Sequence, residues 1–476
     1  MKQFKICFLL LSVMIVLLAC VSTEEEVIAE EKVIAEEEKV YEGISYYVAL
    51  GDIESAIAEY EKAFDVNPED PETANLYARL LMLAGENQEA REILLKIILK
   101  DSENVSAYYS LSILAGIEGN EEEQKEYLGE IIEKQPDDTD ALAMLGEIQL
   151  RDDELEEARE SFEQALDADS ENIIAVLGMG NIMIQEKEYS NAEDYFDKAI
   201  EIFSEYSFSY VDRAYVRKNQ GNYTGAIEDL TKAIELHPDF YWNYIDRGKI
   251  YLLLEYKDEA AADFESAISF DANYFLAYMY LAGIYYEFGI SCYDDIEGWD
   301  WDLALEYWEY ALENYKMSAF LNEEYYFVYG PMGVLNFVLD DWDEALESFV
   351  TAYEKDKKDH IYALLAALTY YKLGRDSEAA NYIGAIAQTI SQDTWFYEVA
   401  NYLKRPSYDI PLVNYYKAEE NQTIKNRILF YLASYYLIAG NERAAQTFFI
   451  DVETLGMSGM IEKILAHYEL VKMGTE

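Results

Sequence analysis

A tight cluster of acidic residues has the chemistry of a cation site. It consists of Asp294, Asp295, Glu297, Asp300 and Asp302. Carboxylate oxygens are the ligands that calcium prefers, but this spacing is not that of the helix–loop–helix calcium loop, and Trp299 and Trp301 interrupt it. We therefore expect a solvated loop over 290–302 rather than a metal site, and whether the loop binds a cation stays open.

The remaining residues offer little for catalysis. His237 precedes Pro238 and is expected to be structural, while His360 and His467 stand alone. The sequence contains no serine-nucleophile, zinc-protease, phosphate-loop or paired-cysteine motif. Acidic pairs are so abundant that they carry no information about a glycosidase-type site. We expect no enzyme, no cofactor and no metal.

Charge and composition limit the function further. Lys and Arg total 36 against 94 for Asp and Glu, so the formal net charge of the 476 residues is −58. Such a field repels phosphate backbones and excludes nucleic acid as a partner. Hydrophobic residues reach 51% and aromatic residues 15%, which excludes a disordered acidic chain.

The first twenty residues have the layout of a secretory signal. Lys2 and Lys5 precede an uncharged apolar run that ends at Ala19, too short for a comfortable membrane span. The run closes with Leu17-Leu18-Ala19-Cys20, which resembles the lipobox of bacterial lipoproteins. The resemblance implies cleavage before Cys20, which would carry a diacylglycerol and an N-acyl chain such as palmitate. Several acyl chains anchor a protein stably to a membrane.

The glutamate-rich segment 20–42 follows as a lipidated acidic tether and spaces the folded part from the bilayer. The resemblance to lipoproteins implies a lipid-anchored protein of the bacterial cell membrane or outer membrane that faces the periplasm or the exterior. Cys292 then remains as a free thiol.

A 34-residue period runs through the rest of the chain. It is marked by Pro68, Pro136 and Pro238, by Gly51, Gly85, Gly119, Gly221 and Gly289, and by Ala56, Ala90, Ala158, Ala192, Ala226 and Ala260. Large apolar residues follow four places after these alanines, and small or apolar residues three places later. Spacings of four and three put these side chains on one face of a helix.

The segment 207–240 shows how one repeat is built. Tyr210 and Ala214 predict a first helix over 207–219, and Gly221 supplies the left-handed residue at its end. Ala226 predicts a second helix over 224–236, which Pro238 ends. Two helices cannot bury their own apolar face, so neighbouring repeats must stack.

This pattern resembles the tetratricopeptide repeat (TPR) family, most closely over 223–238. The resemblance covers about 37–459 and implies an all-α fold, a right-handed superhelical α-solenoid of about 11 or 12 helix–turn–helix units. Gln124 and about ten extra residues at 290–299 depart from the pattern.

The sequence therefore predicts six divisions of the chain. They are a signal peptide 1–19, a tether 20–42, an N-terminal TPR array 43–289, an insertion with a resumed helix and linker 290–325, a C-terminal array 326–459 with a degenerate unit 394–425, and a capping helix and tail 460–476.

In this family the first helices of successive repeats line a groove that receives an extended peptide or a partner helix. The resemblance places an aromatic groove on repeats six to ten, which begin at about residue 207. Its candidate residues are Phe208, Tyr215, Trp242, Lys249, Tyr286, Phe327, Phe337 and Tyr371. The alternative for each of them is packing between neighbouring helices. Some relatives grip a terminal carboxylate with Lys, Asn and Arg, but only Asn181 fits that clamp here.

We expect a non-catalytic scaffold or adaptor that binds one or more envelope proteins through a basic or amphipathic segment, because the groove is rimmed by acid. Two alternatives stay open. One is a structural lipoprotein that forms homo-oligomers, and the other is a solute-binding or enzymatic accessory protein.

Overall fold

The computed structural model describes residues 39–64, 70–294, 298–406, 409–455 and 460–474. The chain divides into two compact units, with the boundary between Gly225 and Ala226. They are called unit 1 and unit 2 below. Residues 290–325, the expected insertion with a resumed helix and linker, lie inside unit 2. The signal, Cys20, most of the tether and Pro68 lie outside the described residues.

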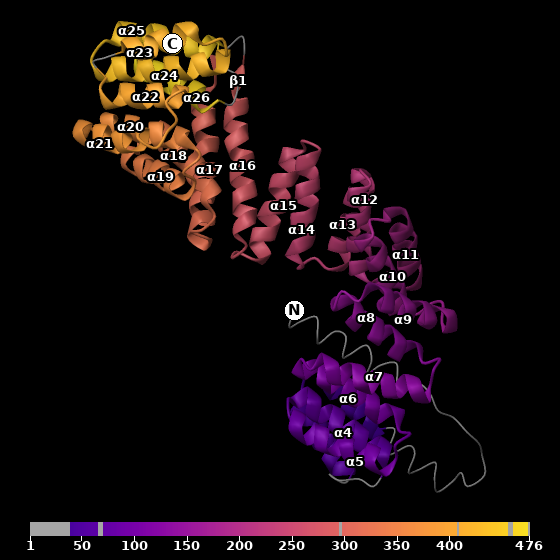
Figure 1. Ribbon diagram of the computed structural model, residues 1–476. Coiled ribbons are helices and arrows are strands. Elements are labelled where there is room, and N and C mark those ends of the chain that lie inside the picture. The colour runs from indigo at the N-terminus through magenta and orange to yellow at the C-terminus, as the bar shows by residue number, and fades with distance from the viewer. Residues whose placement is uncertain (1–38, 65–69, 295–297, 407–408, 456–459, 475–476) are drawn as a thin grey trace, which may run out of the picture. The chain divides into compact units, whose positions relative to one another are not determined.

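Unit 1 is a succession of helical pairs (Figure 1). A helix over 39–49 comes first. It is followed by α3 (Ile53–Ala63), α4 (Pro71–Ala84), α5 (Asn87–Lys100), α6 (Val105–Glu118), α7 (Glu121–Lys134), α8 (Thr139–Arg151), α9 (Leu155–Ala168), α10 (Ile173–Gln185), α11 (Tyr189–Ile202) and α12 (Ser207–Asn219). The two helices of each pair pack together, and the second helix packs against the first helix of the next pair, such as α5 with α6 and α7 with α8. Two sets of first helices, α4 with α6 and α8 with α10, also pack together. This stacking buries the faces that one pair leaves open.

Helix α13 (Tyr223–Leu236) spans the boundary, and unit 2 continues the same pattern. Its elements are α14 (Tyr241–Leu253), α15 (Lys257–Phe270), α16 (Phe275–Ser291), α17 (Trp301–Leu321), the 3₁₀ turn η2 (Tyr326–Val328), α18 (Tyr329–Val338), α19 (Trp342–Lys355), α20 (His360–Lys372), α21 (Asp376–Ala387), α22 (Trp395–Lys404), α23 (Ile410–Ala418), α24 (Gln422–Ile438), α25 (Glu442–Leu455) and α26 (Ile461–Lys472). The described elements confirm the all-α solenoid.

The insertion lengthens two helices instead of forming a loop alone. Helices α16 and α17 have 17 and 21 residues, and they pack side by side. The turn between them holds a two-residue antiparallel ladder of β1 (Tyr293–Asp294) and β2 (Gly298–Trp299). Residues 295–297 of the acidic cluster lie outside the described residues.

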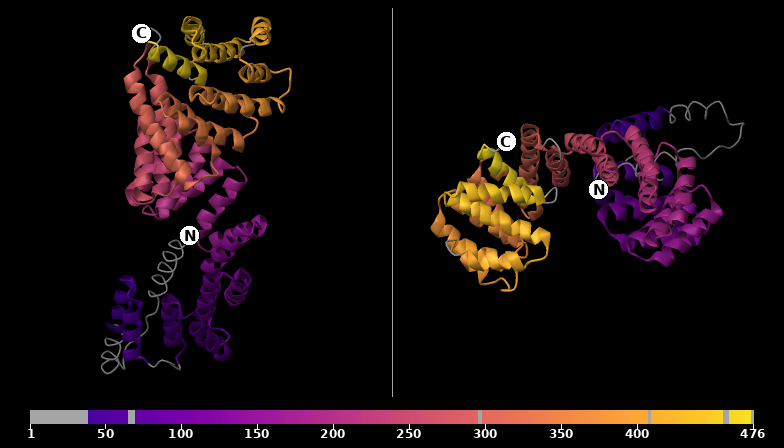
Figure 2. Two further views of the ribbon diagram at one scale, coloured as in Figure 1. Left: turned by 90° about the vertical axis from the view of Figure 1, so that its left-hand side faces the viewer. Right: turned by 90° about the horizontal axis from the view of Figure 1, so that it is seen from above.

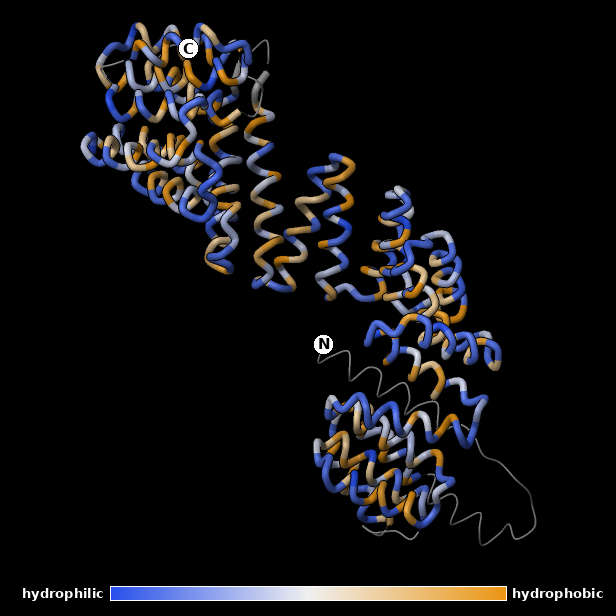
Figure 3. Tube along the Cα trace, in the orientation of Figure 1, coloured by the Kyte–Doolittle hydropathy of each residue, from blue (hydrophilic) through white to orange (hydrophobic). Residues whose placement is uncertain are grey.

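Local sequence explains where the helices begin. Asp and Asn side chains accept hydrogen bonds from backbone N–H groups of the first turn, which otherwise lack a partner. These N-caps include Asp70, Asn104, Asn120, Asp138, Asn172, Asp300, Asp341 and Asn421. Figure 3 shows hydrophobic and hydrophilic stretches alternating along the helices, as a one-sided core requires.

The 34-residue period holds in the structure. The alanines of the period are fully buried, and so are Phe162, Phe196 and Phe264 beside them. The turn between paired helices has a positive φ at every period from Gly51 to Glu255, including the non-glycine residues Asp153 and Lys187. Gly289 differs, because it lies within α16 and packs against Trp308.

The last helix does more than cap the end of unit 2. α26 packs against α18, α24 and α25, and Figure 2 shows this yellow helix lying against the orange helices. Its apolar residues Ile464, Leu465 and Tyr468 are buried, and so are Glu462 and Glu469. α26 therefore occupies space between the repeats of unit 2 and is covered on more than its apolar face.

Candidate partner-binding surface

The structure separates the eight candidate groove residues by burial. Three are open to solvent, namely Tyr215 in α12 with 45% of its surface exposed, Trp242 in α14 with 38% and Phe327 in η2 with 62%. Phe208, Lys249 and Tyr286 are partly buried. Phe337 and Tyr371 are buried. The eight residues therefore do not form one continuous open surface.

The two buried residues are covered by helices of unit 2. The ring of Phe337 meets Tyr468 of α26 edge to face, with ring centroids 5.6 Å apart. The hydroxyl of Tyr371 donates to the backbone oxygen of Leu403, and its ring packs against Tyr435. Both residues thus hold the repeat array together, and neither is available to a partner in this arrangement.

The first helices of unit 1 carry acidic side chains in crowded surroundings. Burial raises the pKa of Glu147 in α8 to about 7, with a smaller opposing effect of Arg151. Burial also raises the pKa of Asp212 in α12 to about 7. Glu147 remains accessible to water although protein surrounds it. These helices therefore present acids where a clamp for a terminal carboxylate would need basic side chains.

The raised pKa of Glu147 predicts a pH dependence of unit 1. The folded state holds the proton of Glu147 more tightly than the unfolded state, so stability falls as pH rises from about 4 to about 7. Because the Glu147 side chain is exposed to water, solvent screening keeps this loss of stability small. We expect Glu147→Gln to reduce this loss of stability, as measured by urea denaturation across that pH range. We also expect a carbon NMR titration of the Glu147 carboxyl group to give a pKa of about 7. The control Glu163→Gln removes the same charge from an exposed site on α9. Identical pH profiles for both variants would contradict the assignment.

Unit 2 presents a chain of touching aromatic rings, which we name the aromatic ledge. It consists of Tyr241, Trp242, Tyr274, Phe275, Tyr325, Tyr326 and Phe327. The rings lie where α14 and α16 begin and along η2, so the repeat itself brings them together. The ring centroids of Trp242 and Tyr274 are 4.9 Å apart, and those of Phe275 and Tyr325 are 5.1 Å apart. Trp242 and Phe327 are the exposed rings of the ledge, and the other five are partly buried. Exposed aromatic surface of this kind marks interaction sites.

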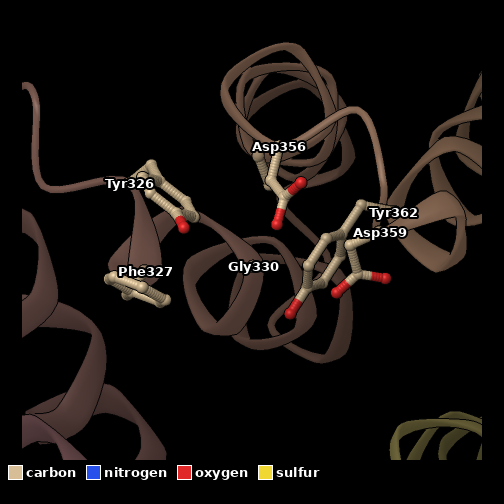
Figure 4. A pocket seen from close by; sticks show the side chains of 7 residues that line it. Tyr326, Phe327, Gly330, Asp356, Asp359 and Tyr362 are labelled. Carbon is tan, nitrogen blue, oxygen red and sulfur yellow. The ribbon is translucent and has the colours of Figure 1, made fainter.

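The ledge ends at a small hollow, which we name the acidic pocket. Its lining residues are Tyr326, Phe327, Gly330, Ala352, Asp356, Asp359 and Tyr362. Figure 4 shows the carboxylate of Asp356 and the rings of Tyr326 and Tyr362 around the hollow, with Phe327 at its side. Burial raises the pKa of Tyr362 to about 12, so its hydroxyl stays protonated at neutral pH and can donate a hydrogen bond.

Sequence reasoning identified Trp242 and Phe327 but missed most of the ledge and both acids of the pocket. Tyr274 and Tyr325 immediately precede α16 and η2, whereas the groove residues were predicted within the first helices themselves. For the ledge residues of α14 and α16, the sequence signal is the recurrence of aromatic pairs at 241–242 and 274–275, 33 residues apart.

The histidines have structural surroundings. His237 stacks on Phe240, and His360 Nδ1 lies 2.8 Å from the backbone oxygen of Lys358. His467 Nδ1 lies 2.6 Å from Glu453 Oε1. Within the described part of the chain, no three His, Cys, Asp or Glu side chains gather as metal ligands would. In the same ranges, every helix is too short or too polar to span a membrane.

The paired helices and their stacking define a helical-repeat protein. A family model described as "Tetratricopeptide repeat protein 21 N-terminal ARM repeat" matches residues 44–260, and one described as "Tetratricopeptide repeat" matches residues 335–393. The chain therefore carries tetratricopeptide-type repeats, which are typically non-catalytic scaffolds for protein–protein interaction.

Solved structures with similar helices include a tetratricopeptide repeat protein from Parabacteroides merdae, with 22% identity, a TM-score of 0.40, and coverage of 52% of this chain and 98% of that one. YrrB, "a TPR protein with an unusual peptide-binding site", shares 19% identity with a TM-score of 0.36 over 44% of this chain and 98% of its own. Pseudomonas aeruginosa PilF shares 18% with a TM-score of 0.38 over 47% and 94%. No curated protein matches the chain.

Proposed function

We propose that the protein is a lipid-anchored, non-catalytic scaffold of a bacterial cell envelope. In this proposal it holds a basic or amphipathic segment of another envelope protein on the aromatic ledge. The observation that carries the proposal is the ledge itself, because it combines exposed rings with neighbouring acids on repeats of an interaction-scaffold type. The net charge of −58 favours a basic partner.

The anchor rests on the segment that ends Leu17-Leu18-Ala19-Cys20. With Cys20 acylated, the protein stays with the membrane on the periplasmic or exterior side, and the acidic tether extends its repeats away from the lipid. We expect Cys20→Ser to release the protein into the soluble fraction of source cells. A Cys20→Ser protein that still requires detergent for extraction would contradict lipid anchoring.

The partner is tested by crosslinking in intact source cells, capture of the protein and mass spectrometry. We expect the double variant Trp242→Ala and Phe327→Ala to lose specific crosslinked proteins, because it removes two exposed rings of the ledge. The control is Tyr256→Ala, which removes a half-exposed ring beyond the far end of α14. Partners retained by the double variant would refute the ledge as the binding surface.

A second candidate function is self-association through α17. This helix exposes Leu303, Tyr310, Met317 and Phe320 at spacings of seven, seven and three, which place them on one face. Light scattering of the protein without its acyl chains distinguishes the two functions. A monomer at micromolar concentration would contradict self-association, whereas a dimer that Met317→Lys dissociates would support it.

A further inference from the structure

The acidic pocket is formed where two repeats of unit 2 meet. Tyr326 and Phe327 come from η2 and Gly330 from the start of α18, while Ala352 and Asp356 belong to the end of α19. Asp359 and Tyr362 come from the start of α20. The hollow has a volume of about 100 Å³. It is therefore smaller than the cavities of about 300–1,000 Å³ that take whole small-molecule ligands.

Gly330 is required for the shape of the pocket. A Cβ atom at this position would lie 2.2 Å from Cζ and Oη of Tyr362. The absence of a side chain allows the Tyr362 ring to lie across α18, where it stacks on Phe349. The repeat thus holds the Tyr362 ring in place beside the hollow before any ligand arrives.

The carboxylates of Asp356 and Asp359 in the pocket can each accept further hydrogen bonds. Asp356 Oδ1 accepts a hydrogen bond from the backbone N–H of Lys358, and Asp359 Oδ1 accepts one from Ile361. Each bond uses one carboxylate oxygen and leaves the other. Over the described ranges, neither Asp356 nor Asp359 forms a salt bridge.

The nearby cations are engaged elsewhere. Lys355 pairs with Glu324 at 2.8 Å, and the ammonium of Lys357 lies over the Tyr353 ring. Arg427 lies within electrostatic reach of Asp359, but its Nε is 3.4 Å from Glu462 and its guanidinium lies over Trp395. The pocket therefore offers negative charge that the neighbouring cations do not fully neutralise.

We propose that the acidic pocket takes the charged head of a lysine or arginine side chain from the segment bound on the ledge. Carboxylates supply charge-assisted hydrogen bonds to such a head. The exposed ring of Phe327 and the ring of Tyr326 supply faces for cation–π contact. This inference rests on the proposed function, since it names the chemistry by which the ledge selects a segment.

The test measures binding of fluorescein-labelled octalysine and octaarginine to the full chain with Cys20→Ser, by anisotropy at physiological salt. We expect the double variant Asp356→Asn and Asp359→Asn to bind about tenfold more weakly. Asparagine retains the oxygen that caps the helix, so folding is preserved. We expect Phe327→Ala to weaken binding about fivefold. The two peptides show whether an ammonium or a guanidinium fits better.

A matched control separates the pocket from general attraction to an acidic protein. Asp258→Asn with Glu259→Gln removes two exposed charges from the first turn of α15. Equal weakening by the pocket and control variants, with native circular dichroism for both, would overturn the inference. If the cellular partners depend on Trp242 but not on Asp356 and Asp359, the pocket inference fails while the scaffold proposal stands. If crosslinking finds no ledge-dependent partner, the proposed function fails, whatever the peptides do.

Discussion

Replacing Lys372 by Met is expected to lower the free energy of unfolding of unit 2 by about 3–5 kcal/mol at neutral pH. Lys372 of α20 lies 2.7 Å from Glu469 of α26, and Glu469 is almost fully buried. The rings of Phe337, Trp342 and Tyr468 surround the ammonium, with centroids 5.0–5.6 Å away. Met fills a similar volume, so the variant chiefly removes the charge that compensates Glu469.

The destabilisation caused by Lys372→Met should depend on pH in a definite direction. Burial already raises the pKa of Glu469, and Lys372 opposes this effect. Without Lys372 the pKa of Glu469 rises further, so the folded state binds the proton more tightly than the unfolded state. The variant is therefore least stable relative to the wild type above that pKa, and it recovers as the pH falls and Glu469 becomes neutral. Asp340 and Lys472 also face this site.

The change in the free energy of unfolding is measured by urea denaturation, with hydrogen exchange of the backbone amides of α18–α26 as the probe. The matched control is Lys372→Met with Glu469→Met, which replaces the pair by apolar side chains and should be much less costly than Lys372→Met alone. A loss that is equal in both variants and independent of pH would show that packing, and not the buried charge, explains the cost.

The positions of the helices could be predicted from the sequence because they repeat. The expected helices 207–219 and 224–236 correspond to α12 (Ser207–Asn219) and α13 (Tyr223–Leu236). The turn of the 34-residue period also forms at positions where the sequence has no glycine. Lys187 and Glu255 adopt the left-handed conformation that glycine adopts in other repeats, because the geometry of the stacked pairs requires a turn there.

Features that occur once could not be predicted in this way. Phe337 has the spacing of a groove residue, and only the folded chain reveals that Tyr468, more than 100 positions later, covers it. Asp356 and Asp359 lie in a short connection at positions where acids commonly cap helices, and 94 acidic residues make such a pair inconspicuous. Their contact with Tyr326 and Tyr362 depends on the packing of two repeats.

Gly289→Ala is expected to destabilise unit 2 by about 3 kcal/mol. Gly289 lies near the end of α16, and a Cβ atom there would stand 2.1 Å from Nε1 of Trp308. Trp308 of α17 is fully buried and donates its indole N–H to the backbone oxygen of Tyr286 at 3.1 Å. The methyl group must displace this ring, which costs about 1–3 kcal/mol in overpacking and about 1–3 kcal/mol if the hydrogen bond breaks. The higher helix propensity of alanine offsets about 1 kcal/mol.

Gly283 provides the control within the same helix. A Cβ atom at Gly283 meets only the hydroxyl of Tyr315, at 4.0 Å, so Gly283→Ala should stabilise α16 by up to about 1 kcal/mol. The two substitutions are chemically identical and lie less than two turns apart, but their expected effects have opposite signs. Thermal unfolding of both variants, followed by tryptophan fluorescence, therefore measures the contact between α16 and Trp308 directly. If both variants were stabilised, Trp308 would not lie against Gly289, and the side-by-side packing of α16 and α17 would be wrong.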